Sequence, residues 1–167
     1  MKELLTCYAA YTAWANDRIR ETLLSLSDSQ QQQEISSSFT SIYKTAFHVW
    51  GATYLWLKRV QHEPHIIKLD DPFNGSMEKL CEAWKLVDRD YAEIVKSMGE
   101  EALIQKLKYQ NFRGDPFEEE LYLILQHIFN HATYHRGQLV TLLRQVGQEK
   151  IPSTDFIAWV RSRGINA

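Results

Sequence analysis

Residues 121–146 read LYLILQHIFNHATYHRGQLVTLLRQV, and their apolar side chains recur every three or four positions. This period is that of one buried face of an α-helix. The positions on that face are Leu121, Ile124, Ile128, His131, His135, Leu139, Leu142 and Val146. Glu118 to Glu120 precede them, where the helix dipole favours acids, and Gly147 is a typical residue just past a helix end. The pattern predicts a helix from about Phe117 to Val146.

The same period recurs in three earlier stretches of the chain, which also predict helices. These stretches cover about residues 2–26, 42–62 and 77–98. The apolar face of the first carries Leu4, Tyr8, Tyr11, Ala15, Ile19, Leu23 and Leu26. Thr40 or Ser41 can cap the second helix, and Ser76 can cap the third. The polar residues 30–38 and 70–75 are predicted to be loops.

Two smaller elements accompany the four long helices. Residues 103–109 alternate apolar and polar side chains, which predicts a strand. Residues 111–115 can turn this strand and residues 116–118 can return it as a small β-hairpin before the last long helix. After Pro152, Ser153 or Thr154 can cap a short C-terminal helix. Its apolar residues are Phe156, Ile157, Trp159 and Val160.

One-sided apolar faces on four long helices are best buried by packing the helices around a shared core. The sequence shows no internal repeat and no linker, and 167 residues suffice for one domain with a substantial core. We therefore predict an all-α four-helix bundle that forms a single domain over residues 1–167. The periodicity alone leaves the order of the helices open.

Two histidines occupy positions where the pattern of the last long helix calls for apolar residues. Residues four apart on a helix are separated by ~6 Å along its axis and lie on one face, so His131 and His135 can bind the same metal ion. His127 extends the series but lies ~12 Å from His135, too far for one ion to bind both. The pair is therefore His127 with His131 or His131 with His135, and the register of the apolar face favours the second.

A third ligand has to come from another helix, since two ligands hold a metal ion poorly. His48 is the histidine within the body of the second helix, whereas His62 and His65 lie at its end and are expected at the surface. A lone histidine on an apolar face is usually a hydrogen-bonded core residue. Three imidazoles buried without a partner would be costly, however, and a metal ion removes that cost. All three must be neutral to bind, so affinity should fall as the pH drops through the imidazole range near ~6.5.

Other site patterns are missing from the sequence. There is no HExxH motif, no glutamate three residues before a histidine, and no Walker or Rossmann glycine pattern. The net charge of −2 gives no basic excess for nucleic-acid binding, and no apolar stretch is long enough to span a membrane. Cys7 and Cys81 form no CxxC motif and are expected to be reduced core residues. These features predict a cytoplasmic protein with neither nucleic acid nor membrane as partner.

Residues 130–138, NHATYHRGQ, resemble the signature of the DinB/YfiT-like family of bacterial metalloenzymes. The second helix, with Trp56 to Arg59 after His48, is similar too, and so are Gln145 to Gly147, Pro152 and Asp155. The resemblance covers nearly the whole chain. It implies an up-down-down-up bundle, often a homodimer, with Zn, Ni or another divalent ion on His48, His131 and His135. Some relatives are transferases or isomerases that use low-molecular-weight thiols.

Three neutral imidazoles leave at least one coordination position of a metal ion open, as in catalytic zinc sites. A water or thiol in that position loses its proton near neutral pH and becomes a nucleophile. The leading hypothesis is a metal-dependent enzyme, an S-transferase or hydrolase, that acts on a small molecule and uses a low-molecular-weight thiol. One alternative is a non-catalytic metal-binding protein of the stress or DNA-damage response. Another is a helical interaction module without metal.

Several residues near these ligands carry further expectations. Arg136 and Gln138 could orient a substrate, but Arg136 points ~100° away from His135 and is expected at the surface. Tyr11 and Tyr134 are aromatic candidates for the wall of a pocket, but they are expected to pack in the core. His127 is expected to form a hydrogen bond near the site. A homodimer is predicted from the resemblance and from three tryptophans that do not all fit the apolar faces: Trp14, Trp50 and Trp159.

Overall fold

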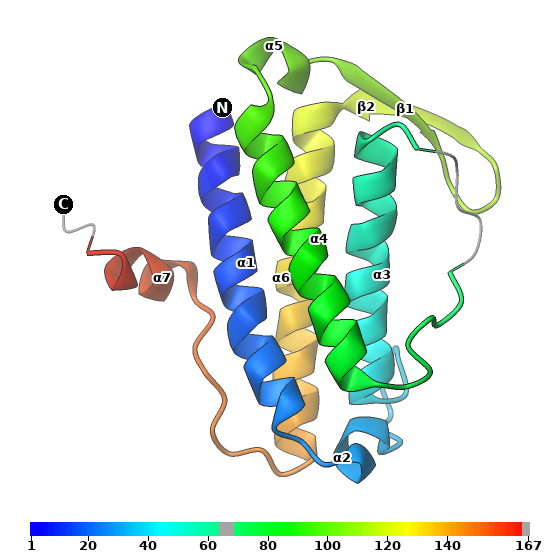
Figure 1. The fold of residues 1–167 in the computed structure, drawn as a ribbon, viewed down its shortest axis with the longest axis vertical. Coiled ribbons are helices and arrows are strands. Elements are labelled where there is room, and N and C mark those ends of the chain that lie inside the picture. The colour runs from blue at the N-terminus through cyan, green and yellow to red at the C-terminus, as the bar shows by residue number, and fades with distance from the viewer. Residues whose placement is uncertain (64–68, 165–167) are drawn as a thin grey trace.

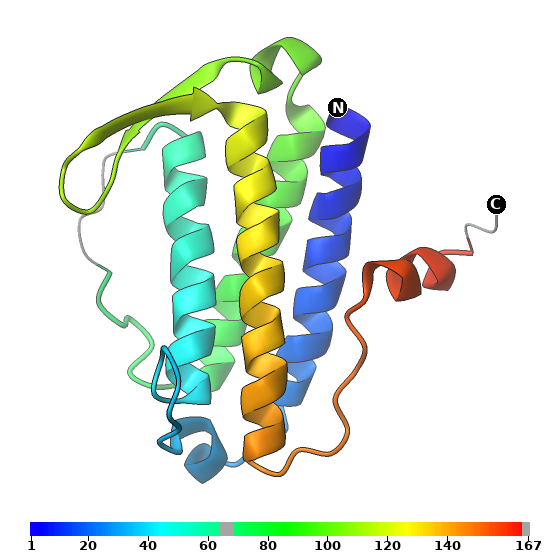
Figure 2. The same cartoon turned by 180° about the vertical axis from the view of Figure 1, so that it is seen from behind.

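Four long helices pack side by side in the computed structural model, which describes residues 1–63 and 69–164 (Figure 1). They are α1 (Lys2–Leu24), α3 (Ile42–Val60), α4 (Met77–Ser97) and α6 (Leu121–Gln145). Helices α1 and α3 each contact both α4 and α6, and so lie diagonally across the bundle. Helices α3 and α4 run in one direction and α1 and α6 in the other (Figures 1 and 2). The predicted all-α bundle with up-down-down-up order is therefore confirmed.

Most residues of the predicted apolar faces form one core that runs the length of the bundle, while Tyr11 and Ala15 pack with Trp159 in a second, smaller cluster. Trp84 on α4 is completely buried at the centre of the larger core. The helix starts follow the predicted caps, since the Ser41 hydroxyl accepts a hydrogen bond from the backbone N–H of Lys44, and Ser76 does the same for Lys79. One position on the first helix is wrong. Leu4, expected on the buried face, lies in the first turn of α1 and is 56% exposed.

The predicted hairpin is present with different bounds: Leu103, expected to begin the first strand, ends a short helix instead, and the second strand continues past residue 118. Strand β1 (Lys106–Gln110) pairs antiparallel with β2 (Pro116–Glu120), so that residues 118–120 lie in a strand and not in the first turn of a helix. Glu118 forms ion pairs at 3.6 and 3.7 Å with Lys106 and Lys108 on the opposite strand. These cross-strand pairs stabilise the extended conformation, and α6 begins only at Leu121.

Three short helices complete the fold: α2 (Asp28–Gln32), α5 (Glu100–Leu103) and α7 (Phe156–Ser162). Helix α2 lies in a stretch expected to be partly loop, and its capping box pairs Ser27 with Gln30. Helix α7 begins after Asp155, one residue later than the latest predicted cap. Within the described residues, no helix combines the length and hydropathy needed to cross a membrane.

The tryptophans do not supply the exposed aromatic surface expected from the sequence. Trp50 is buried against Phe73 and Tyr54, with ring centroids 4.7 and 5.3 Å away. Trp159 on α7 is buried against Tyr11 at 6.0 Å. Trp14 is only partly buried, and the guanidinium of Arg18 lies over its ring. Packing within the chain therefore explains the two tryptophans that are buried.

Candidate metal centre

His48, His131 and His135 meet where α3 packs against α6. His48 lies in the second turn of α3, and the other two lie one turn apart in the middle of α6. The Nε2 atom of His135 is 3.2 Å from Nε2 of His48 and 3.0 Å from Nε2 of His131. One nitrogen from each of the three rings lies within 4.8 Å of the others. The structure thus brings together the three residues that the sequence singled out.

The spacing of these nitrogens fits one divalent ion. Two nitrogens that are each ~2.1 Å from a metal lie ~3.4 Å apart at a tetrahedral angle and ~3.0 Å apart at a right angle. The measured separations of 3.2 and 3.0 Å fall in this range. Histidine nitrogens are also the donors that Zn²⁺ and Ni²⁺ accept readily. The residues therefore fit the metal that the sequence predicted.

Gln138 fixes the orientation of the His135 ring. Its side-chain oxygen lies 2.7 Å from Nδ1 of His135, one turn earlier on the same helix. A carbonyl oxygen can only accept a hydrogen bond, so Nδ1 carries the proton and donates it. Nε2 is then left with a free lone pair that points at His48 and His131. This is the arrangement by which an outer residue prepares a histidine for metal binding.

We expect Gln138→Ala to weaken Zn²⁺ binding about 10–100-fold, the usual cost of removing such an outer partner. The His135 ring would lose the hydrogen bond that sets both its tautomer and its orientation. Competition with a chelator of known affinity measures the change. Gln145→Ala, two turns further along α6, is the matched control and should leave the affinity unchanged. Equal affinities for the two variants would contradict the role assigned to Gln138.

Burial keeps the three rings neutral in the metal-free protein. Burial, together with the neighbouring His135, lowers the pKa of His48 and of His131 to about 4. Burial also lowers the pKa of His135, although the hydrogen bond that His135 donates to Gln138 acts to raise it. A neutral imidazole is the form that binds a metal ion, so the site is ready to bind at neutral pH.

Metal binding should accordingly persist to lower pH than the sequence alone predicted. Protons and metal ions compete for the same nitrogen lone pairs. With pKa values of about 4, His48 and His131 stay unprotonated near pH ~6.5, where a solvated histidine titrates. We expect Zn²⁺ affinity to change little between pH ~7 and ~6 and to fall steeply as the pH approaches 4. Calorimetric titrations across this range measure it, and a loss centred at ~6.5 would contradict the lowered pKa values.

Two aromatic side chains flank the three histidines. Phe39, from the segment between α2 and α3, stacks on His48 at 4.1 Å and lies 6.0 Å from His135. Tyr134 meets the His135 ring edge to face at 4.9 Å and is 65% exposed, so its expected place in the core is wrong. It lies on the side of α6 that no other long helix covers. Phe39 was not predicted, because its loop position gives no periodic signal.

Tyr11 and the remaining histidines also have predicted positions. Tyr11 is buried as expected, and its hydroxyl donates a hydrogen bond to the backbone oxygen of Thr154. His127 is exposed and contacts the rings of Trp56 and His131, at 5.5 and 5.8 Å. The hydrogen bond expected for His127 is not among those of the described residues. His62 is exposed as expected, and His65 lies outside the described residues.

Arg136 is buried, contrary to the surface position expected from the sequence. Only 1% of its surface is exposed, and burial lowers its pKa. The side chain does point away from His135, but that direction faces α1 and not solvent. Its guanidinium donates hydrogen bonds to Asn16, Thr133 and the Tyr11 hydroxyl at 3.0, 2.8 and 3.3 Å. The direction of the Arg136 side chain was therefore predicted correctly, but the helix that covers it was not foreseen.

Asn16 links this arginine to a buried ion pair that the sequence did not reveal. The Asn16 amide donates to both carboxylate oxygens of Asp88 on α4, at 3.0 and 3.1 Å. Arg20, one turn after Asn16 on α1, donates to the same carboxylate at 2.5 Å. Together these residues join α1, α4 and α6 on the side of α6 that faces away from the histidines. Polar residues four apart beside an apolar face were the available signal.

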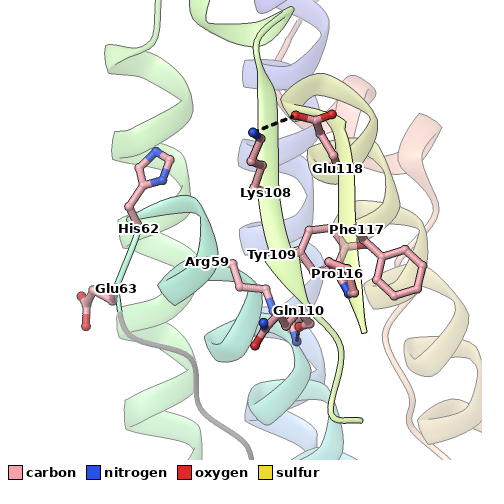
Figure 3. A pocket seen from close by; sticks show the side chains of 9 residues that line it. All are labelled: Arg59, His62, Glu63, Lys108, Tyr109, Gln110, Pro116, Phe117 and Glu118. Carbon is pink, nitrogen blue, oxygen red and sulfur yellow. Dashed lines mark hydrogen bonds and ion pairs between the residues drawn. The ribbon is translucent and has the colours of Figure 1, made fainter. Parts of the chain in front are cut away.

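A separate cavity of about 570 Å³ lies between the end of α3 and the hairpin (Figure 3). Arg59 lines it, with its guanidinium over the rings of Trp56 and Tyr109 at 4.6 and 5.2 Å. Lys108 and Glu118 form an ion pair at its edge, 3.7 Å apart. Eleven residues of α3 separate Arg59 from His48, or ~16 Å of helix axis. This cavity is therefore not part of the histidine site.

Comparison with known proteins places the chain in a family. The family model described as "DinB family" matches residues 1–163. The chain is 27% identical to Protein DinB of Bacillus subtilis (strain 168) over 164 residues, which cover 87% of each protein. It also resembles the crystal structure of a DinB-like protein from Bacillus cereus ATCC 10987, with a TM-score of 0.63 and 23% identity over 83% of this chain and 89% of that one. A DinB-like protein (YjoA) from Bacillus subtilis gives a TM-score of 0.63 and 15% identity over 89% and 97%. The chain belongs to the DinB family.

Proposed function

We propose that this chain is an enzyme that depends on one divalent ion, held by His48, His131 and His135, with S-transfer or hydrolysis as its reaction. The observation that carries the proposal is a set of three potential protein ligands for one ion. In residues 1–63 and 69–164, these three form a cluster of His, Cys, Asp or Glu suited to a metal, and no fourth residue of these types joins them. Structural zinc sites have four protein ligands, whereas catalytic sites have three and keep one position open.

The residues of the site have distinct roles in this proposal. A divalent ion supplies a Lewis acid that makes a thiol or water nucleophilic near neutral pH. Gln138 holds the His135 ring in the tautomer that binds. Phe39 covers one side of His48 and excludes water there, and Tyr134 forms an exposed wall beside His135. The chain would thus position a substrate between two aromatic side chains.

A purely structural ion is the less well supported alternative. The apolar core is continuous along all four long helices, and the ion pair between Arg20 and Asp88 joins α1 to α4 away from the histidines. The bundle is thus stabilised by contacts away from this site, so an ion bound there can take part in a reaction. This favours catalysis over a non-catalytic metal-binding protein.

The proposal extends to the surroundings in which the enzyme works. We propose a low-molecular-weight thiol as co-substrate, a homodimeric assembly and a cytoplasmic location, with no role for nucleic acid. Free Cys7 and Cys81 are consistent with a reducing compartment. The dimer rests on membership of the family, because two of the tryptophans once expected at an interface are buried within the chain.

Cobalt-substituted protein titrated with 2-mercaptoethanol tests the proposed chemistry. A thiolate that enters an open position should add sulfur-to-cobalt charge-transfer bands, because a soft donor binds well to a borderline ion. Protein carrying His135→Ala should show no such bands. A wild-type cobalt spectrum that responds to no thiol would leave the metal site intact and overturn the thiol-dependent reaction.

A further inference from the structure

A groove of about 450 Å³ adjoins the three histidines. One wall is the segment of residues 36–38, between α2 and α3, and the other is the exposed side of α6 from Tyr134 to Gln145. In Figure 2 the segment rises from α2 and passes over the first turns of α3. Eleven residues of α6 span ~16 Å along the helix axis, so the groove is long enough for an extended small molecule. Its volume is also that of a typical ligand site.

One end of the groove is lined by residues that contact the three-histidine site. Tyr134 lines it and contacts the His135 ring at 4.9 Å. Gln138 lines it as well, and its oxygen lies 2.7 Å from Nδ1 of the same ring. A molecule lying in this groove would therefore have one end beside the three Nε2 atoms.

Among the described residues, no charged side chain lines the groove, and hydroxyl and amide groups lie beside apolar surface from Tyr134 and Leu142. Ser36 to Ser38 supply hydroxyls on one wall, and Thr141, Gln138 and Gln145 supply a hydroxyl and two amides on the other. No Lys, Arg, Asp or Glu lines it. A carboxylate or phosphate taken from water into such a groove would lack a partner of opposite charge. Hydroxyl and amide groups, in contrast, would find donors and acceptors along its whole length.

Gly137 lies in the wall of the groove, and no packing contact requires a glycine there. Glycine in a helix interior destabilises it relative to alanine. At Gly51, an added Cβ would lie 2.8 Å from Leu69, so packing explains that glycine. At Gly137 an added Cβ would meet nothing within 4 Å, and the residue is helical with an ordinary φ. A side chain at position 137 would thus extend into the space outside the helix, which is the groove.

We propose that this groove binds the uncharged, hydroxyl- or amide-bearing part of the substrate and presents its reactive group to the three-histidine site. The inference rests on the proposed function, because it takes the metal as the site of reaction. Gly137 keeps the groove open beside α6. Gln138 serves both the metal ligand and the groove, and so links the place of binding to the place of chemistry.

Three hydroxamates test the groove on cobalt-substituted protein, since they share one metal-binding group. Acetohydroxamate has no tail, the hydroxamate of N-acetylglycylglycine has an uncharged amide tail, and its N-succinyl counterpart ends in a carboxylate. Affinities are read from the visible cobalt bands. We expect the uncharged tail to raise affinity about tenfold over acetohydroxamate through several new hydrogen bonds, and the carboxylate to forfeit most of that gain.

The substitution Gly137→Leu fills the groove and should remove the gain from the tail, while cobalt content and acetohydroxamate affinity stay within about twofold of wild type. Ala10→Leu, at an exposed position of α1, is the matched control and should keep the full gain. Gly137→Ala is a second variant in case Gly137→Leu does not fold. It should raise the unfolding temperature by about 2–4 °C and still narrow the groove.

The possible results distinguish failure of the groove proposal from failure of the proposed metal site. Cobalt uptake with a normal acetohydroxamate response, but no gain from the uncharged tail or a gain that survives Gly137→Leu, overturns the groove alone. Failure to take up cobalt overturns the proposed function and the groove with it. Conversion of a dimer to a monomer by Gly137→Leu, measured by sedimentation, would assign this face to a second copy of the chain and overturn the proposal.

Discussion

Replacing His135 with alanine is expected to lower the affinity for Zn²⁺ or Ni²⁺ by more than about 100-fold, since outer partners of a ligand alone are worth 10–100-fold. His135 lies at the centre of the cluster, with its Nε2 within 3.2 Å of the nitrogens of both other rings. Two remaining histidines would leave the ion mostly solvated. Equilibrium dialysis against a competing chelator measures the loss.

The helical content of His135→Ala should stay close to that of the wild type in circular dichroism, because the core of the four helices continues past the site. His127→Ala is the matched control, one helical turn before His131 on the same helix. It removes an exposed imidazole that lies outside the cluster, so stoichiometric metal should remain. Full metal loss in His127→Ala, or retention in His135→Ala, would show that the ligand set is wrong.

Replacing Asp88 with alanine is expected to destabilise the protein by about 3–5 kcal/mol, the typical cost of removing one partner from a buried ion pair. The Asp88 carboxylate accepts hydrogen bonds from Arg20 at 2.5 Å and from Asn16 at 3.0 and 3.1 Å. Without it, the buried Arg20 guanidinium keeps Asp17 as its acidic partner among the described residues, at 2.7 Å. Asn16 would also lose its link between α4 and Arg136.

Urea unfolding measures this loss, and Asp90→Ala on the same helix is the control. Asp90 pairs with Arg89 at the surface, where such pairs are worth about 0–1 kcal/mol. The Asp88 variant should therefore lose several times more stability than the Asp90 variant. Similar losses would mean that the Asp88 network contributes no more than a surface ion pair.

The helices of this fold were predictable because each buries one face, and the period of that face is visible in the sequence. Caps at Ser41 and Ser76 and the stop at Gly147 were readable for the same local reason. The start of α6 was not, because residues 118–120 suit both a helix N-terminus and a strand. Pairing with the lysines of β1 decided between the two, and that pairing is a contact between strands rather than a property of the local sequence.

The candidate site divides in a similar way. His131 and His135 stood out because they interrupt an apolar face, and His48 because it lies within a helix. Phe39 could not be found, since it lies in a loop and reaches His48 only through the fold. Arg136 was placed at the surface because helical rotation gives a direction but not the neighbour in that direction. In the bundle that neighbour is α1, with Asn16 and Tyr11 as partners.

Metal analysis of protein purified without a histidine tag tests the three-histidine centre most directly. Mass spectrometry of the digested protein, after equilibration with Zn²⁺ and removal of the free ion, should find one zinc per wild-type chain. It should find almost none in a variant with His48, His131 and His135 all replaced by alanine. Wild-type protein that retains no zinc, or a triple variant that retains one zinc per chain, would contradict a metal centre on these histidines.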